Sequence, residues 1–324
     1  MTNSPSLVIQ IPPGPTGPSL TPVTAIALPI VVDTAALAIS MEEGLHLLIN
    51  RPGSGETFHF RVRQSYQVEQ LSALPLVGTG VVGCGQEIIV TGAGSNGFPQ
   101  VLSVNLDSKV AWHFQVDDLI PIHHPVPGCT PRPVVAWQRG HGNLEVADCG
   151  PAGVVHRGTF RVGGPPLEIA FGHDRIWSAW ATPTGIRLAG FGQDVLSSEI
   201  PAYFASDMAV GAYPEGGCLV WTQSGTNLFG RVLADGRLAA PPEEIDLDGA
   251  AGGKLALVPG PEPLVWAQRV EIREGESPDW TSVLVIPGSP PIRIDGLVHA
   301  VAWWNEMVVI VGSETMHFLQ RVPR

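Results

Sequence analysis

Histidines and cysteines are the residues of this chain whose side chains could bind a metal ion. His123 and His124 are adjacent and precede a proline, and His141 lies in the segment Arg-Gly-His-Gly-Asn. Adjacent side chains of a strand point to opposite faces, so the histidine pair cannot easily chelate one ion. A site shared with His141 would need a third ligand, and no residue is identified for it. We therefore predict no metal and no other cofactor.

The four cysteines bear on the compartment in which the protein works. They are Cys84, Cys129, Cys149 and Cys218, and none of them has the spacing of a zinc site. The first twenty residues lack the basic start and long apolar core of a secretory signal, which predicts a cytoplasmic protein. Thiols stay reduced there, so we expect free buried thiols, with Cys129–Cys149 as the most plausible disulfide if one forms.

Common catalytic motifs are missing from the sequence. It contains no GxSxG, no HExxH, no glycine-rich phosphate loop with its lysine and no sialidase-type Asp box. Three pairs of adjacent carboxylates lie at expected turns or edges, where solvation explains them without acid–base chemistry. The sequence leaves an enzyme open but favours a protein without catalytic activity.

The element that must position any site is a degenerate repeat of short apolar segments. Three copies are nearly identical: VVAWQ at 134–138, LVWTQ at 219–223 and LVWAQ at 264–268. With four weaker copies, the central residues lie 41 to 47 residues apart; they are Ile49, Val90, Trp137, Trp180, Trp221, Trp266 and Ile310. Several short strands per unit of about 40–50 residues are typical of WD40-like propeller blades. We predict an all-β fold, a single seven-bladed β-propeller, with six or eight blades as the alternatives.

The strand order within a blade is clearest in residues 203–246. An inner strand at 206–212, a second strand at 218–223 and a third at 228–233 are followed by an outer strand at 238–245, with Gly, Pro or Asp-Gly turns between them. The 38 glycines and 31 prolines leave little room for helices of about 11–12 residues, the usual mean length.

The two ends of the sequence complete this arrangement. Only one strand, 315–322, follows the last repeat core, so the last blade lacks an outer strand that residues 21–32 can supply. We therefore divide the chain into a proline-rich N-terminal arm at 1–20 and a propeller at 21–324. The arm is an extended contact to a partner or a frayed terminus. The most apolar N-terminal stretch, 23–40, is interrupted by Pro29 and Asp33, so no membrane span is expected.

The run LVWTQSGTNLFGRVLADGR, from Leu219 to Arg237, resembles the repeat of bacterial β-propeller repeat proteins. In that repeat a "VVW" strand is followed by a polar turn, a strand ending in "RV" and then "DG". The resemblance is good over this blade, fair over the blades with VVAWQ and LVWAQ, and covers about a third of the chain. It implies the fold and a bacterial origin, and it transfers no activity.

The tryptophans of the repeat are candidates for a sugar-binding site. Trp137, Trp221 and Trp266 lie within wholly apolar strands, where packing between blades is the better explanation. Trp280 lies in an insertion rich in glutamate, so it is either an exposed anchor for a partner or part of the local hairpin packing.

The net charge of −12 disfavours nucleic acid, because only 18 basic residues are present to neutralise phosphates. The prediction is a protein–protein interaction module, a scaffold or adaptor subunit of a larger bacterial assembly. The alternatives are a propeller that binds a glycan or small ligand and, less favoured, a hydrolase or lyase acting at the channel mouth. The candidate contact residues lie where the repeat is interrupted or ends: Arg51, His123, His124, Arg139, His141, Arg269, Arg273 and Trp280.

Overall fold

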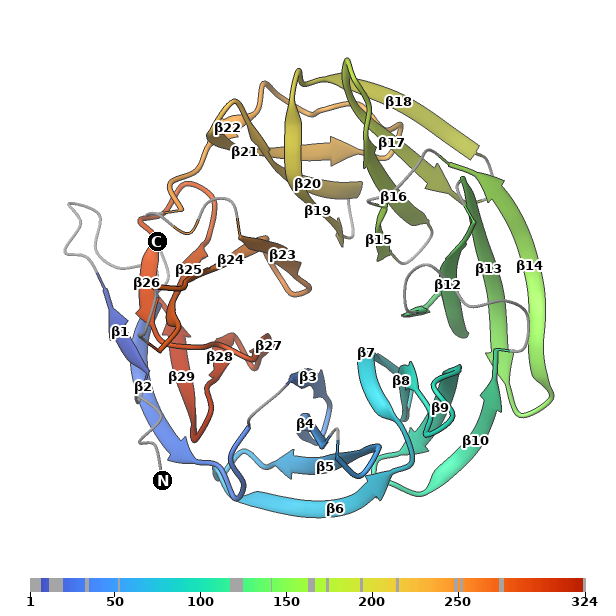
Figure 1. The fold of residues 1–324 in the computed structure, drawn as a ribbon, viewed down its shortest axis with the longest axis vertical. Coiled ribbons are helices and arrows are strands. Elements are labelled where there is room, and N and C mark those ends of the chain that lie inside the picture. The colour runs from blue at the N-terminus through green and yellow to red at the C-terminus, as the bar shows by residue number, and fades with distance from the viewer. Residues whose placement is uncertain are drawn as a thin grey trace. The chain divides into compact units, whose positions relative to one another are not determined.

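The computed structural model shows an all-β chain. It describes residues 7–11, 20–32, 35–51, 53–116, 125–140, 142–162, 167–172, 175–192, 195–213, 216–247, 250, 253–273 and 277–322. Within these ranges there is no helical residue, and hence no helix long and apolar enough to cross a membrane. The strands form seven antiparallel sheets, and the fold is the seven-bladed β-propeller that the repeat predicts (Figure 1).

The chain divides into two compact units, which we call the central unit (Val32–Ile176) and the terminal unit (Met1–Val31 with Trp177–Arg324). Three whole sheets belong to the central unit. The first contains β3 (Ala36–Met41), β4 (Gly44–Arg51), β5 (Glu56–Val62) and β6 (Val68–Leu74). The second contains β7 (Val77–Cys84), β8 (Glu87–Ala93), β9 (Pro99–Asn105) and β10 (Val110–Gln115). The third contains β11 (Val126–Cys129), β12 (Pro133–Arg139), β13 (Asn143–Gly150) and β14 (Gly153–Arg161).

The remaining sheets keep the same order. The fourth contains β15 (Leu167–Phe171), β16 (Ile176–Ala181), β17 (Gly185–Phe191) and β18 (Val195–Pro201). The fifth contains β19 (Ala205–Tyr213), β20 (Gly216–Gln223), β21 (Thr226–Leu233) and β22 (Glu243–Glu244). The sixth contains β23 (Lys254–Val258), β24 (Leu264–Glu271), β25 (Asp279–Val285), β26 (Ile292–Asp295) and, at its edge, β1 (Val8–Gln10). The seventh contains β27 (Ala300–Trp304), β28 (Met307–Val311), β29 (Thr315–Arg321) and β2 (Leu20–Ala27).

The central residues of the repeat all lie on the second strand of a sheet and are buried. Trp221 on β20 is 1% exposed and Trp266 on β24 is 6% exposed, which confirms that these tryptophans belong to the core. The outer strand expected at 238–245 is shorter than predicted. Only Glu243–Glu244 and a single bridge from Leu238 to Val232 pair there, because Pro241 and Pro242 have no N–H to donate.

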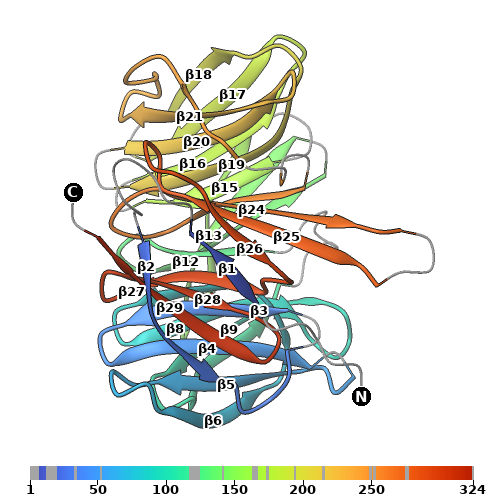
Figure 2. The same cartoon turned by 90° about the vertical axis from the view of Figure 1, so that its left-hand side faces the viewer.

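The N-terminal strand closes the last sheet, as predicted. Strand β2 pairs antiparallel with β29, from Leu20 opposite Arg321 to Ala27 opposite Thr315 (Figure 2). Upstream of it, β1 pairs with β26 on the sixth sheet, and the buried Leu7 lies against Gly296 and Gly312. The part of the predicted arm at 7–11 therefore forms contacts in the terminal unit, whereas residues 12–19 lie outside the described residues.

The expectation about the cysteines is wrong for one pair. Cys84 and Cys129 form a disulfide, and Cys149 and Cys218 are free and buried. Cys129 is the last residue of β11 and Cys149 lies on β13, with β12 between them. Two strand spacings are about 9–10 Å, which exceeds the reach of a disulfide of about 7 Å between Cα atoms. Cys84 and Cys129 instead end the inner strands of neighbouring sheets, with Cα atoms 5.4 Å apart.

Buried polar side chains link three of the second strands to the start of the next sheet. In the central unit, Asn50 donates to the carbonyl of Gly78 (2.7 Å) and accepts from its N–H (2.9 Å). Thr91 donates to the carbonyl of Pro125 at 2.7 Å. In the terminal unit, Gln268 donates to the carbonyl of Val298 at 3.0 Å. Because each link satisfies a buried backbone group, these residues fix the spacing of consecutive blades.

Candidate functional site

Three of the predicted arginines occupy the same position of the repeat. Arg51, Arg139 and Arg269 directly follow the buried amides Asn50, Gln138 and Gln268, and all three are exposed. Consecutive side chains of a strand point to opposite faces, so the arginine after each buried amide points away from the face on which the amide is buried. Arg51 lies over the ring of Phe58 on the neighbouring strand β5, with its guanidinium carbon 5.4 Å from the ring centre. The predicted histidines His123, His124 and His141 lie outside the described residues.

Arg269, Arg273 and Trp280 belong to one hairpin of the terminal unit, formed by β24 and β25. Strand β23 pairs with β24 only as far as Gln268, whereas β24 and β25 continue to pair up to Glu271 opposite Asp279. The tip of the hairpin therefore projects past its neighbours in the sheet (Figure 2).

The projecting tip has two different faces. Arg269 and Arg273 each approach Glu271, at 3.7 Å and 3.4 Å, so one face is charged and internally paired. By alternation the other face carries Val270 and Ile272, with Trp280 directly opposite Val270. Ile272 is 76% exposed. An apolar face of this kind on a projecting hairpin is suited to contact another protein.

Two further exposed aromatic residues of the terminal unit were not predicted from the sequence. Tyr203 is 61% exposed and Phe204 is 85% exposed, in the turn between β18 and β19. Phe204 has a φ of 58°, an uncommon backbone conformation for a bulky residue. Residues 203–204 form a turn that contains neither Gly nor Pro, so the turn pattern of the sequence gave no signal for them.

A pocket of about 620 Å³ lies in the central unit, between the outer strand β10 of the second sheet and strands β12 to β14 of the third. Its volume is within the range of about 300–1,000 Å³ that small-molecule sites have. One wall is Phe114, which stacks on Trp112 with the ring centres 5.4 Å apart and an interplanar angle of 7°. The other wall includes Trp137 and the predicted contact residue Arg139. We call this cavity the Arg139 pocket.

A buried carboxylate lies at the floor of the Arg139 pocket. Glu145 is 4% exposed, and its Oε2 accepts hydrogen bonds from His156 Nε2 at 2.6 Å and from Thr159 Oγ1 at 2.8 Å. Trp137, Glu145 and Thr159 are direct cross-strand neighbours on β12, β13 and β14, so they share one face of the sheet. The hydroxyl of Thr159 donates to Glu145, so Thr159, Glu145 and His156 form one hydrogen-bonded cluster on this face.

A β-bulge brings His156 to the same face. His156 and Thr159 are three residues apart, so in a regular strand they would face opposite sides. The pairing shifts between Gly158 opposite Val146 and His156 opposite Ala147, which makes Arg157 the extra residue. Bulges commonly redirect side chains beside functional sites. Here the bulge directs His156 to Glu145, and no alternation in the sequence could have shown it.

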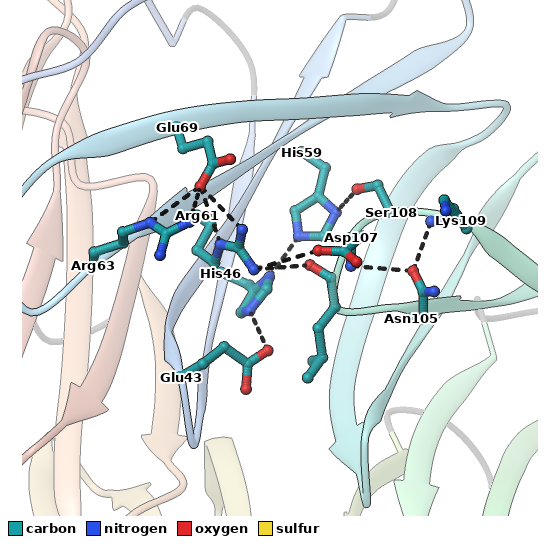
Figure 3. Close-up of polar contacts among 11 residues, drawn as sticks. Glu43, His46, His59, Arg61, Arg63, Glu69, Asn105, Asp107, Ser108 and Lys109 are labelled. Atoms are coloured by element: carbon teal, nitrogen blue, oxygen red, sulfur yellow. Dashed lines mark hydrogen bonds and ion pairs between the residues drawn. The ribbon is translucent and has the colours of Figure 1, made fainter.

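A second polar cluster, buried in the central unit, connects the first and second sheets (Figure 3). His46 on β4 and His59 on β5 are hydrogen-bonded through Nδ1 and Nε2 at 2.7 Å, and His59 Nδ1 contacts the hydroxyl of Ser108. His46 Nε2 is 3.7 Å from Glu43 Oε1. We assign the proton order so that Ser108 donates to His59, His59 donates to His46 and His46 N–H faces the Glu43 carboxylate.

Burial keeps both histidines of this cluster neutral. Desolvation, with a smaller effect of the Arg61 guanidinium, lowers the pKa of His46 to about 4. Desolvation, followed by the charges of His46 and Arg61, lowers the pKa of His59 to about 3. Arg61 itself is held by Glu69 on β6 at 3.0 Å and by Asp107 at 3.7 Å.

The order Ser108–His59–His46–Glu43 resembles a proton relay, but it is not accessible to a substrate. Ser108 is 3% exposed and both histidines are 0% exposed. A catalytic serine must reach a carbonyl, so the cluster acts as a structural link between two blades. Among the described residues, no three His, Cys, Asp or Glu side chains are grouped so that they could hold a metal ion.

Comparisons with known proteins agree with the fold. No family model matches the chain, and no curated protein matches its sequence. A chain of the structure described as "Crystal Structure of Mitotic Checkpoint Complex" matches over 94% of this chain and 92% of that chain, with a TM-score of 0.57 and 14% identity. The β-propeller domain of Cps50 (Swd1) from Myceliophteria thermophila matches over 94% of this chain and 100% of that chain, with a TM-score of 0.58 and 12% identity. The chain is thus similar in fold to β-propellers.

Proposed function

We propose that this protein is a non-catalytic protein–protein interaction module, a scaffold or adaptor subunit of a larger bacterial assembly, that binds its partner through the tip of the β24–β25 hairpin. The observation that carries the proposal is the projecting apolar face, where Ile272 is 76% exposed beside Val270 and Trp280. Exposed apolar side chains bordered by charged ones are the usual composition of a docking surface.

Two further observations support a partner that is a protein. The net charge of −12 gives poor electrostatics for nucleic acid. A chain of similar fold occurs in the structure of the mitotic checkpoint complex, so this fold is compatible with a role inside an assembly. The bacterial origin rests on the resemblance of the repeat at Leu219 to Arg237.

The test compares matched surface variants in a quantitative pull-down from the native host. Ile272→Asp places a charge in the apolar tip, and Val195→Asp, at a residue that is 64% exposed on β18, is the control. We expect one protein to be recovered by the wild type and by Val195→Asp and to be lost with Ile272→Asp. That protein is then purified, and its Kd for each variant is measured.

The same experiment distinguishes the hairpin from the exposed aromatic residues of the β18–β19 turn. If Phe204→Asp removes the partner while Ile272→Asp retains it, the docking surface is the β18–β19 turn and the hairpin assignment is wrong. If no protein differs in recovery between the wild type and these variants, the interaction proposal itself is refuted.

A further inference from the structure

We propose that the Arg139 pocket of the central unit binds a planar aromatic group that lies next to a carboxylate. This site is separate from the hairpin of the terminal unit, and its chemistry differs from that of a protein docking face. The pocket combines aromatic walls, an arginine without a partner among the described residues and a carboxylate that is already hydrogen-bonded. Each of these three features restricts the class of ligand.

The walls favour a flat ring. Phe114 is held in place by its stacking on Trp112, which is 7% exposed and belongs to the core between the second and third sheets. Trp137 is 9% exposed and is part of the same core. Because both walls are fixed before a ligand arrives, an aromatic group can stack there without ordering mobile side chains.

The cation favours a carboxylate. Arg139 is exposed at the end of β12, and among the described residues its side chain has no hydrogen bond or ion pair. A guanidinium presents parallel N–H donors that match the two oxygens of a carboxylate. A ligand with that group would satisfy donors that the described part of the chain leaves open.

Glu145 does not make the pocket a site for cations. Its Oε2 already accepts from His156 and Thr159, and only 4% of the residue is exposed. A cationic ligand would instead meet the charge of Arg139. The role of Glu145 is to hold His156, whose side chain is 54% exposed and whose Nδ1 is the ring atom available to a ligand.

The test uses N-acetyl-L-tryptophan as the probe and its neutral analogue, N-acetyl-L-tryptophanamide, as the comparison. Binding is measured by isothermal titration calorimetry on the full chain. We expect the acid to bind with a Kd of about 1 mM or lower, and the amide to bind about tenfold more weakly, the effect of losing one charge-assisted hydrogen-bond pair. This comparison needs no variant, so it remains decisive even if a variant fails to fold.

Two arginine variants locate the binding. Arg139→Gln should abolish the preference for the acid. Arg51→Gln, at the equivalent repeat position of the first sheet, is the matched control and should retain it, because Arg51 does not line the pocket. Equal affinity for acid and amide in the wild type, a Kd for the acid above about 10 mM, or an unchanged preference in Arg139→Gln each overturns the proposal.

A third probe identifies the source of the ligand. The peptide Gly-Gly-Trp with a free carboxyl terminus carries the same ring and carboxylate at the end of a chain. If it binds about tenfold more tightly than N-acetyl-L-tryptophan, the natural ligand is the carboxyl terminus of a polypeptide. If the two affinities are equal, the natural ligand is a small aromatic acid. Either result supports the chemistry of the site.

Discussion

The buried histidine pair should make the stability of the protein depend on pH in a specific window. The pKa of His46 is about 4 and that of His59 is about 3 in the folded state, whereas an unfolded histidine has a pKa of about 6.5. Because the folded-state pKa values lie below the unfolded value, both histidines are neutral in the folded and in the unfolded chain well above pH 6.5. They do not lower the free energy of unfolding there. As pH falls below 6.5, the unfolded chain takes up protons that the folded chain refuses, and stability is lost.

The size of the effect follows from the two pKa values. Each proton bound only by the unfolded state costs about 1.4 kcal/mol per pH unit. From pH 7.5 to pH 5 each histidine therefore lowers the free energy of unfolding by about 2 kcal/mol, and the pair by about 4 kcal/mol. The loss is a large part of the 5–15 kcal/mol that stabilises a typical domain.

Urea unfolding followed by circular dichroism at pH 7.5 and pH 5 measures this loss. The variant His46→Gln/His59→Gln should lose about 4 kcal/mol less than the wild type over the same interval. His113→Gln, which removes a histidine outside the cluster, is the matched control. Equal pH dependence in the wild type and the double variant would refute the reasoning. So would histidine NMR signals showing that His46 or His59 is protonated in the folded protein at pH 5.

Two other perturbations test the links between blades. Reducing the Cys84–Cys129 disulfide, which closes a separation of 45 residues, should lower the free energy of unfolding by up to about 4 kcal/mol. A urea midpoint that does not change with reductant, or that changes equally in Cys84→Ser/Cys129→Ser, would contradict this. Gln268→Leu removes two buried hydrogen bonds and should cost about 1–3 kcal/mol. Gln138→Leu, at the equivalent position, should cost less stability because the buried amide of Gln138 has no partner among the described residues. Equal losses of unfolding free energy in the two variants would show that the hydrogen bonds of Gln268 are not the cause.

Most of the fold was predictable because it depends on a local and repeated pattern. The apolar segments around Ile49, Trp221 and Ile310 each form the second strand of a sheet, since a strand buried on both faces needs a continuous apolar run. The closing strand was predictable for a similar reason, because a missing outer strand at the C-terminal end requires a partner from elsewhere.

The sites were predictable only in part, because they depend on contacts between different blades. The repeat placed Arg139 at an exposed strand end. Phe114, on the other side of the pocket, comes from a neighbouring sheet, which the repeat does not indicate. The bulge at Arg157, which directs His156 into the pocket, is not visible in the sequence either. One signal was present in the sequence and was missed. Cys84 and Cys129 are 45 residues apart, one repeat length, so they occupy equivalent ends of adjacent inner strands.

The pairing of the N-terminal strands has a consequence for biosynthesis. Gln10 on β1 contacts Asp295 at a separation of 285 residues, and β2 pairs with β29 still further along the chain. At about 5–20 residues per second, translation of that interval takes roughly 15–60 s. During this time β1 and β2 have no partner and their apolar side chains stay exposed. Completion of the terminal unit therefore waits until β29 has been synthesised.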